Sequence, residues 1–148
     1  MKKHALWMLA AGLLLAADAP KDDAVKKELT KADGLWQVVS FEIDGNKLGD
    51  DEAKAIKMTI KEGKYHAKSM DNTVSRGLLV LNPSKKPTEV DIKPEEGDNQ
   101  GQTMPGIYEL KDDDLKICFA PPDKTRPTKF QSEAGSGHNL IVFKRVKS

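Results

Sequence analysis

Short segments in which apolar and polar residues alternate recur along most of the sequence, and their regular spacing is the feature that most constrains the fold. Roughly eight or nine such segments follow one another, about 8–12 residues apart. In the segment 115–119, for example, Leu115, Ile117 and Phe119 share one face of an extended chain. Turn residues separate most of the segments, which predicts antiparallel neighbours, and closing the sheet removes its exposed edges. We therefore expect an all-β fold, an antiparallel up-and-down β-barrel, with a β-sandwich as the alternative.

The same patterns place the expected elements along the chain. Residues 20–31 have the weak apolar stripe of a short helix, and residues 50–55 are long enough for one helical turn. In the first strand the apolar face changes near Val38, which predicts a β-bulge there. The expected strands are 34–43, 56–60, 65–70, 73–81, 88–93, 106–110, 115–119, 128–133 and 138–146.

The N-terminus has the parts of a secretory signal peptide. A basic start and an apolar run over 5–16 precede a small-x-small pattern at 17–19, and the run is shorter than the roughly 20 residues that span a bilayer. Pro20 is unfavourable directly after a cleavage point, so a cut one or two residues away, or retention of the segment as an anchor, stays open. We expect a signal peptide at 1–19 and a barrel domain over 20–148. The predicted location is periplasmic or extracellular, without a stable membrane span after processing.

The charge of the chain is nearly balanced. Lys and Arg number 24 against 23 Asp and Glu, and the basic residues are scattered along the sequence. Aromatic residues make up only 5% of the chain, so few side chains are available to stack on bases. The sequence therefore predicts no nucleic-acid partner.

No arrangement of residues typical of a catalytic or metal site occurs in the sequence. Cys118 is the single cysteine and lies in no nucleophile motif, so we expect it to be a packed structural residue, with catalysis as the lesser alternative. His66 and His138 lack companions at zinc-ligand spacing. The acidic run at 112–114 lacks the spacing of a calcium loop and is typical of a solvated hairpin turn. We therefore predict a non-enzymatic protein without catalytic residues, metal or cofactor.

Two residues near the ends of the expected barrel form a recognisable pair. Gly34-Leu35-Trp36 at the start of the first strand, with Arg145 near the end of the last, resembles the G-x-W motif and terminal arginine of the lipocalin superfamily. The resemblance implies that Arg145 packs across Trp36 and closes one end of the barrel. A guanidinium group over an indole ring gains a cation–π interaction, which is a physical reason for the pairing.

A longer set of segments resembles one lipocalin-like domain family of unknown function, which is expanded in planctomycete bacteria. The resemblance covers roughly residues 30–147. It implies an exported bacterial protein with a lipocalin-like barrel, and it implies no established reaction. The segments, in order, are Trp36-Gln37-Val38-Val39-Ser40 with Asp44-Gly45, Val90-Asp91-Ile92, 106–110, 115–120, 126–130 and Phe143-Lys144-Arg145.

Three residues are candidates for ligand binding: Tyr108, Arg126 and Phe130. Arg126 could hold a ligand carboxylate or phosphate at the barrel mouth while Phe130 packs on its apolar part. Alternatively, Arg126 pairs with Asp91 or Glu109 and fixes the loop that follows Pro121-Pro122. The ring of Tyr108 could line a cavity or simply fill the barrel.

The leading functional hypothesis is an exported, non-enzymatic binding protein that holds a small, partly apolar or amphiphilic ligand in the barrel. The alternative is an envelope protein–protein interaction or inhibitor module that presents its loops to a partner. An enzyme housed in the barrel is a weaker third possibility, because the sequence shows no acid–base constellation. A hollow barrel would favour the ligand-binding protein, and a filled barrel would favour the interaction module. The alternation of apolar and polar residues is the same in a hollow and in a filled barrel, so it does not distinguish the two hypotheses.

Overall fold

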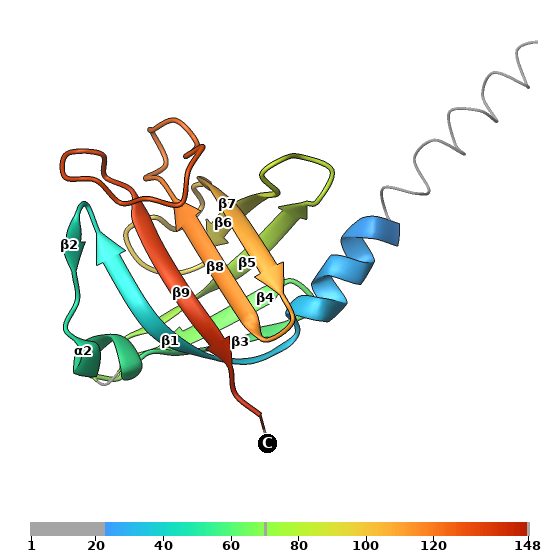
Figure 1. Cartoon of the computed structure of the whole chain (residues 1–148), viewed down its shortest axis with the longest axis horizontal. Helices are drawn as coiled ribbons and strands as arrows, with labels where there is room; N and C mark the ends of the chain where they lie inside the picture. The colour runs from blue at the N-terminus through green and yellow to red at the C-terminus, as the bar shows by residue number, and fades with distance from the viewer. Residues whose placement is uncertain (1–22, 70, 148) are drawn as a thin grey trace, which may run out of the picture.

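The computed structural model describes residues 23–69 and 71–147, in which an antiparallel sheet closes on itself (Figure 1). Strands that follow one another along the barrel are neighbours, and the first strand also pairs with the last. The expected all-β, antiparallel up-and-down barrel is therefore confirmed, with eight strands in the barrel and one short extra strand. The predicted signal peptide, 1–19, lies outside the described residues. The elements are β1 (Gly34–Ile43), β2 (Asn46–Lys47), α2 (Asp50–Lys54), β3 (Lys57–Lys61), β4 (Lys64–Lys68), β5 (Val74–Asn82), β6 (Glu89–Pro94), β7 (Met104–Lys111), β8 (Asp114–Phe119) and β9 (Asn139–Arg145).

The bulge expected in the first strand is where the barrel closes. β1 pairs with β9 from Trp36 to Ile43, and the register shifts between Val38 and Ser40. Trp36 and Val38 are buried before the shift, whereas Phe41 packs against the core after it. The extra residue thus lets one strand keep apolar side chains inside the barrel on both sides of the shift. The prediction of a bulge near Val38 is confirmed.

A helix covers the barrel end at which β1 begins and β9 ends, called here the closed end. Residues 23–32 are helical, and Figure 1 shows this N-terminal helix beside the turn between β7 and β8. The indole Nε1 of Trp36 donates a hydrogen bond of 2.8 Å to the carbonyl of Ala32 at the helix end, and Ala32 is itself buried. The helix expected over 20–31 is thus confirmed within the described residues, as is the helical turn expected over 50–55.

One expected strand is absent from the fold. Residues 128–133 lie in the long loop 120–138 between β8 and β9, and the prediction of a strand there is wrong. β8 and β9 pair with each other along their whole lengths, from Asp114↔Lys144 to Phe119↔Asn139, so no strand edge is left between them. The loop instead lies over the outer face of the sheet, where Cys118 of β8 donates a hydrogen bond to the Gln131 carbonyl. Figure 1 shows the loop at the end of the barrel opposite the N-terminal helix.

Alternation along each strand divides the side chains between the core and the solvent. In β5, for example, Leu79 and Leu81 are buried, whereas Leu78 and Val80 are exposed. The inward residues of all eight barrel strands form one core cluster around Trp36. Within residues 23–69 and 71–147, no helix has both the length and the apolar character needed to cross a membrane.

Candidate functional site

The interior of the barrel is filled by its own side chains. Among the pockets that residues 23–69 and 71–147 line, the one inside the barrel is a cavity of about 10 Å³. A single water molecule needs at least ~10–15 Å³, and pockets that hold drug-sized ligands measure ~300–1,000 Å³. The barrel interior is therefore a packed core. The residues that line the cavity are Ala32, Ile60, Leu79, Leu81, Val90, Tyr108, Leu110, Leu115 and Ile117.

Tyr108 is part of this packed core. Its side chain is buried, and its hydroxyl donates a hydrogen bond of 2.7 Å to Oε2 of Glu28 on the N-terminal helix. Burial, and then the neighbouring Glu28 carboxylate, raise the pKa of Tyr108 above its ordinary value, so the phenol holds its proton. Thr88 also donates a hydrogen bond to the Tyr108 carbonyl. Tyr108 thus fills the barrel and links the helix to β7.

Tyr108 and Phe130 also border one groove on the outside of the barrel. The groove has a volume of about 340 Å³, and Glu28, Pro87 and Thr88 line it together with these two aromatic residues. The Lys116 ammonium lies 5.2 Å from the centre of the Phe130 ring, on the outer face of β8. The structure therefore brings two of the three candidate ligand residues together, but Arg126 does not line this groove.

The donors of Arg126 are engaged by the protein itself. Its Nη1 donates hydrogen bonds of 3.0 Å and 2.8 Å to the carbonyls of Val90 and Gly106, and its Nη2 donates one of 2.7 Å to Asp91. The Glu89 carboxylate lies 3.7 Å from its Nε. This geometry corresponds to the structural alternative, in which Arg126 pairs with Asp91 and fixes the loop to β6 and β7. A ligand anion at Arg126 would have to compete with two carboxylates.

Trp36 and Arg145 are in contact at the closed end. The Arg145 guanidinium carbon lies 4.3 Å from the centre of the Trp36 ring. The same guanidinium donates hydrogen bonds of 2.6 Å to the carbonyl of Lys31, in the last turn of the N-terminal helix, and to that of Asp33, which directly follows the helix. Carbonyls at a helix C-terminus lack partners within the helix and carry partial negative charge, so a cation stabilises them. Arg145 therefore fastens the helix to the barrel across Trp36.

Two neighbours complete the surroundings of Arg145. Gly34 has a φ of +141°, and a Cβ atom there would lie 2.8 Å from Nη1 of Arg145. This close approach explains why glycine stands two residues before Trp36. On the other side, Asp113 lies 3.2 Å from Nε of Arg145, and a hydrogen bond from Lys147 together with the Arg145 charge lowers the pKa of Asp113.

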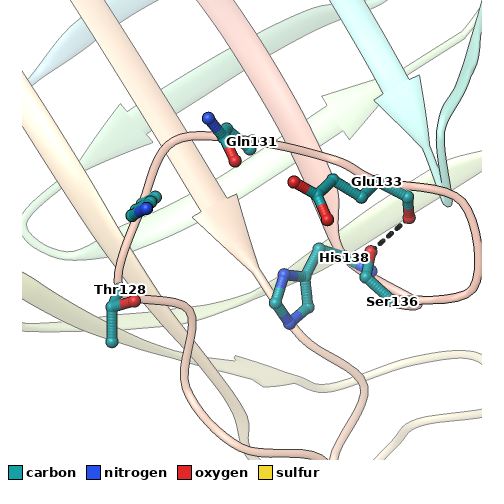
Figure 2. Close-up of a pocket in the computed structure, with 6 residues that line it drawn as sticks. Thr128, Gln131, Glu133, Ser136 and His138 are labelled. Atoms are coloured by element: carbon teal, nitrogen blue, oxygen red, sulfur yellow. Dashed lines mark hydrogen bonds between the residues drawn. The ribbon is translucent and has the colours of Figure 1, made fainter.

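The loop 120–138 encloses a polar hollow of about 300 Å³ (Figure 2). Figure 2 shows the Glu133 carboxylate and the His138 ring projecting toward its middle. The nearby Ser136 hydroxyl donates to the Glu133 carbonyl and accepts from the backbone N–H of His138, so it belongs to the turn of the loop. The serine is therefore engaged in holding the loop rather than aligned with the imidazole as a nucleophile would be.

Cys118 lies beneath this loop. Its side chain is fully buried, and burial raises the pKa of its thiol, which keeps the group in its less reactive protonated form. It lies opposite Ile107 of β7, which is also buried and, like Cys118, lies outside the core cluster of the barrel interior. Among the described residues, no three His, Cys, Asp or Glu side chains gather closely enough to hold a metal ion.

The fold also gathers basic residues that are scattered in the sequence. Six of them project from the outer surface of four consecutive strands, β3 to β6, and we call this surface the basic face. The alternation of the strands places these residues on one side, because Lys57 and Lys61 in β3, and Lys64 and Lys68 in β4, are four residues apart and therefore point to the same face. The residues of the basic face are Lys57, Lys61, Lys64, Lys68, Arg76 and Lys93.

Comparison of the chain with protein-family models, curated proteins and solved structures finds no match. The resemblance to the planctomycete lipocalin-like family therefore stays a prediction from the sequence. The barrel, and the contact between Trp36 and Arg145, are consistent with it. The fold by itself assigns no activity, so function has to be argued from the surfaces and spaces described above.

Proposed function

We propose that this chain is an exported, non-enzymatic binding module that contacts its partner through its outer surface. The observation that carries the proposal is the packed interior, because the cavity that the described residues line inside the barrel measures about 10 Å³, which is too small for a ligand. The leading hypothesis from the sequence places a ligand inside the barrel, and the packed core argues against that location. The alternative, an interaction module, needs only an exposed surface and agrees better with this geometry.

The groove beside Tyr108 and Phe130 is a second candidate site, for a small and partly apolar ligand. Its volume of about 340 Å³ is at the lower end of the range for ligand pockets. Two carboxylates, Glu28 and Glu109, line it, whereas Arg126 stands apart. A ligand in this groove would therefore be neutral or cationic, which differs from the anionic amphiphile that Arg126 suggests.

A titration with a fluorescent fatty acid and a neutral analogue of equal size tests whether the interior binds ligands. In a chain without residues 1–19, Trp36 is the only tryptophan and reports on the core. We expect no saturable binding of either probe and no change in Trp36 emission. Saturable one-to-one binding that quenches Trp36 would contradict the proposal.

A cavity-forming variant supplies the positive control. Ile117 is buried and lines the remaining interior space, so Ile117→Ala enlarges that space. An apolar cavity of sufficient size binds small apolar molecules. We expect Ile117→Ala to take up a small aromatic probe that the wild-type chain excludes, which shows that the assay detects binding inside the barrel.

A further inference from the structure

Like charges face one another across the strands of the basic face. Lys57 lies opposite Lys68, and Lys61 lies opposite Lys64, in the pairing of β3 with β4. Like charges in directly opposed positions destabilise a sheet. Arg76 pairs with Glu96, but none of the five lysines forms an ion pair with a described residue. The arrangement therefore opposes folding rather than supporting it.

On the opposite side of the barrel, charged residues of neighbouring strands lie next to residues of opposite charge. There Lys116 of β8 lies opposite Glu109 of β7, and Lys144 of β9 pairs with Asp114 of β8 at 2.6 Å. The chain as a whole has a net charge of only +1. The outward side chains of β3 to β6 thus carry six positive charges against two negative ones, Glu89 and Asp91, which both lie beside Arg126, and this excess favours an anionic partner on that side.

Two exposed aliphatic residues lie within the basic face. Leu78 and Val80 of β5 have exposed fractions of 37% and 47%. Leu78 stands directly between Lys64 of β4 and Lys93 of β6. An isolated exposed leucine is ordinary, but Leu78 with a lysine on each side combines the two interactions that hold a protein at a lipid surface, and Val80, which lies opposite Asp91, enlarges the apolar area.

The composition of this surface distinguishes between anionic partners. The outward residues of β3 to β6, all of which the structure describes, include no Phe, Tyr or Trp. Single-stranded nucleic acids are held by aromatic side chains on which their bases stack. Aliphatic side chains have no such role there, whereas the boundary between lipid headgroups and acyl chains receives them favourably.

We propose that the basic face binds the surface of a bilayer that contains anionic lipids. The lysines approach the headgroups, and Leu78 and Val80 enter the boundary with the acyl chains. This inference rests on the proposed function, because it names the partner of the outer surface. The attraction acts within about one Debye length, roughly 8–10 Å at physiological salt, so raising the salt concentration weakens it.

Co-sedimentation with vesicles tests the inference. The protein is used from Pro20 onward, which retains the N-terminal helix and every strand of the barrel. We expect binding to vesicles of phosphatidylglycerol mixed with phosphatidylcholine, little binding to phosphatidylcholine alone, and loss of binding at high salt. Equal binding to both kinds of vesicle would overturn the inference.

Charge reversal on the basic face is the main variant. Lys64→Glu with Lys68→Glu turns two like-charged cross-strand pairs into opposite pairs, so the melting temperature is expected to equal or exceed that of the wild type. Vesicle affinity is expected to fall at least about tenfold. The matched control, Lys124→Glu with Lys129→Glu, makes the same change of net charge in the loop 120–138 and is expected to leave binding unchanged. Equal losses in both double variants would overturn the inference.

Substitution of the two exposed aliphatic residues, Leu78 and Val80, distinguishes a bilayer from a soluble polyanion as the partner. Leu78→Thr with Val80→Thr keeps every charge and is expected to weaken vesicle binding severalfold. If it has no effect and the wild-type protein binds polyphosphate or single-stranded DNA as tightly as vesicles, the bilayer is the wrong partner, and binding at the outer surface still stands. Uptake of a fatty acid into the wild-type barrel, measured as described above, would instead contradict the proposed function itself.

Discussion

Replacing Arg145 with alanine is expected to lower the free energy of unfolding by about 3 kcal/mol. The variant loses a cation–π contact of about 1 kcal/mol with Trp36 and charge-assisted hydrogen bonds to the carbonyls of Lys31 and Asp33, each of which contributes about 1.5–3 kcal/mol when measured alone. These contributions overlap, because all of them hold the N-terminal helix on the closed end. Urea denaturation followed by Trp36 emission measures the loss.

Arg145→Lys is the control for this prediction. Lysine keeps the positive charge, but its ammonium group lacks the planar fork that contacts two carbonyls and a ring together. We expect Arg145→Lys to recover less than half of the lost stability. An Arg145→Ala variant with the denaturation midpoint and Trp36 emission of the wild type would show that the closed end does not depend on this contact.

Arg126→Ala is expected to cost about 2–3 kcal/mol and to loosen the loop 120–138. The substitution leaves Asp91 and Glu89 without their shared cation and the carbonyls of Val90 and Gly106 without a donor. The loop is held to the outer face, so local opening should precede global unfolding.

Cys118 provides a direct measurement of this opening. Its thiol is fully buried beneath the loop, and its rate of modification by a thiol reagent reports how often the loop moves away. We expect a modification rate more than tenfold higher in Arg126→Ala, with Trp36 emission unchanged. Lys129→Ala, an exposed residue of the same loop, should modify at the wild-type rate. Slow modification in Arg126→Ala would mean that other contacts hold the loop.

The alternation of the sequence predicts the barrel well because strand pairing depends on local pattern. The change of face near Val38 even locates the bulge. The error at 128–133 has a different origin, since that segment also alternates but has no free strand edge to join. Whether a segment finds a strand edge to pair with depends on which strands already pair with each other. β8 and β9 pair directly, although the loop 120–138 separates them in the sequence, and so leave no edge for residues 128–133.

The candidate site was less predictable than the fold. Alternation is the same for a hollow and a filled barrel, so the packed interior follows only from the volumes of side chains brought together in space. The partner of Tyr108 is Glu28, 80 residues earlier in the chain, and no local pattern links them. The basic face likewise becomes evident only when β3 to β6 are placed side by side.

Methyl resonances of β5 test most directly whether the outer surface binds and the interior does not. Leu78 and Val80 point outward, whereas Leu79 and Leu81 of the same strand point into the core. The protein, with labelled Leu and Val methyl groups, is titrated with anionic bicelles that carry a paramagnetic lipid. We predict strong broadening of the Leu78 and Val80 signals with little change at Leu79 and Leu81. Broadening that begins at Leu79 and Leu81, or none at Leu78 and Val80, would contradict this account.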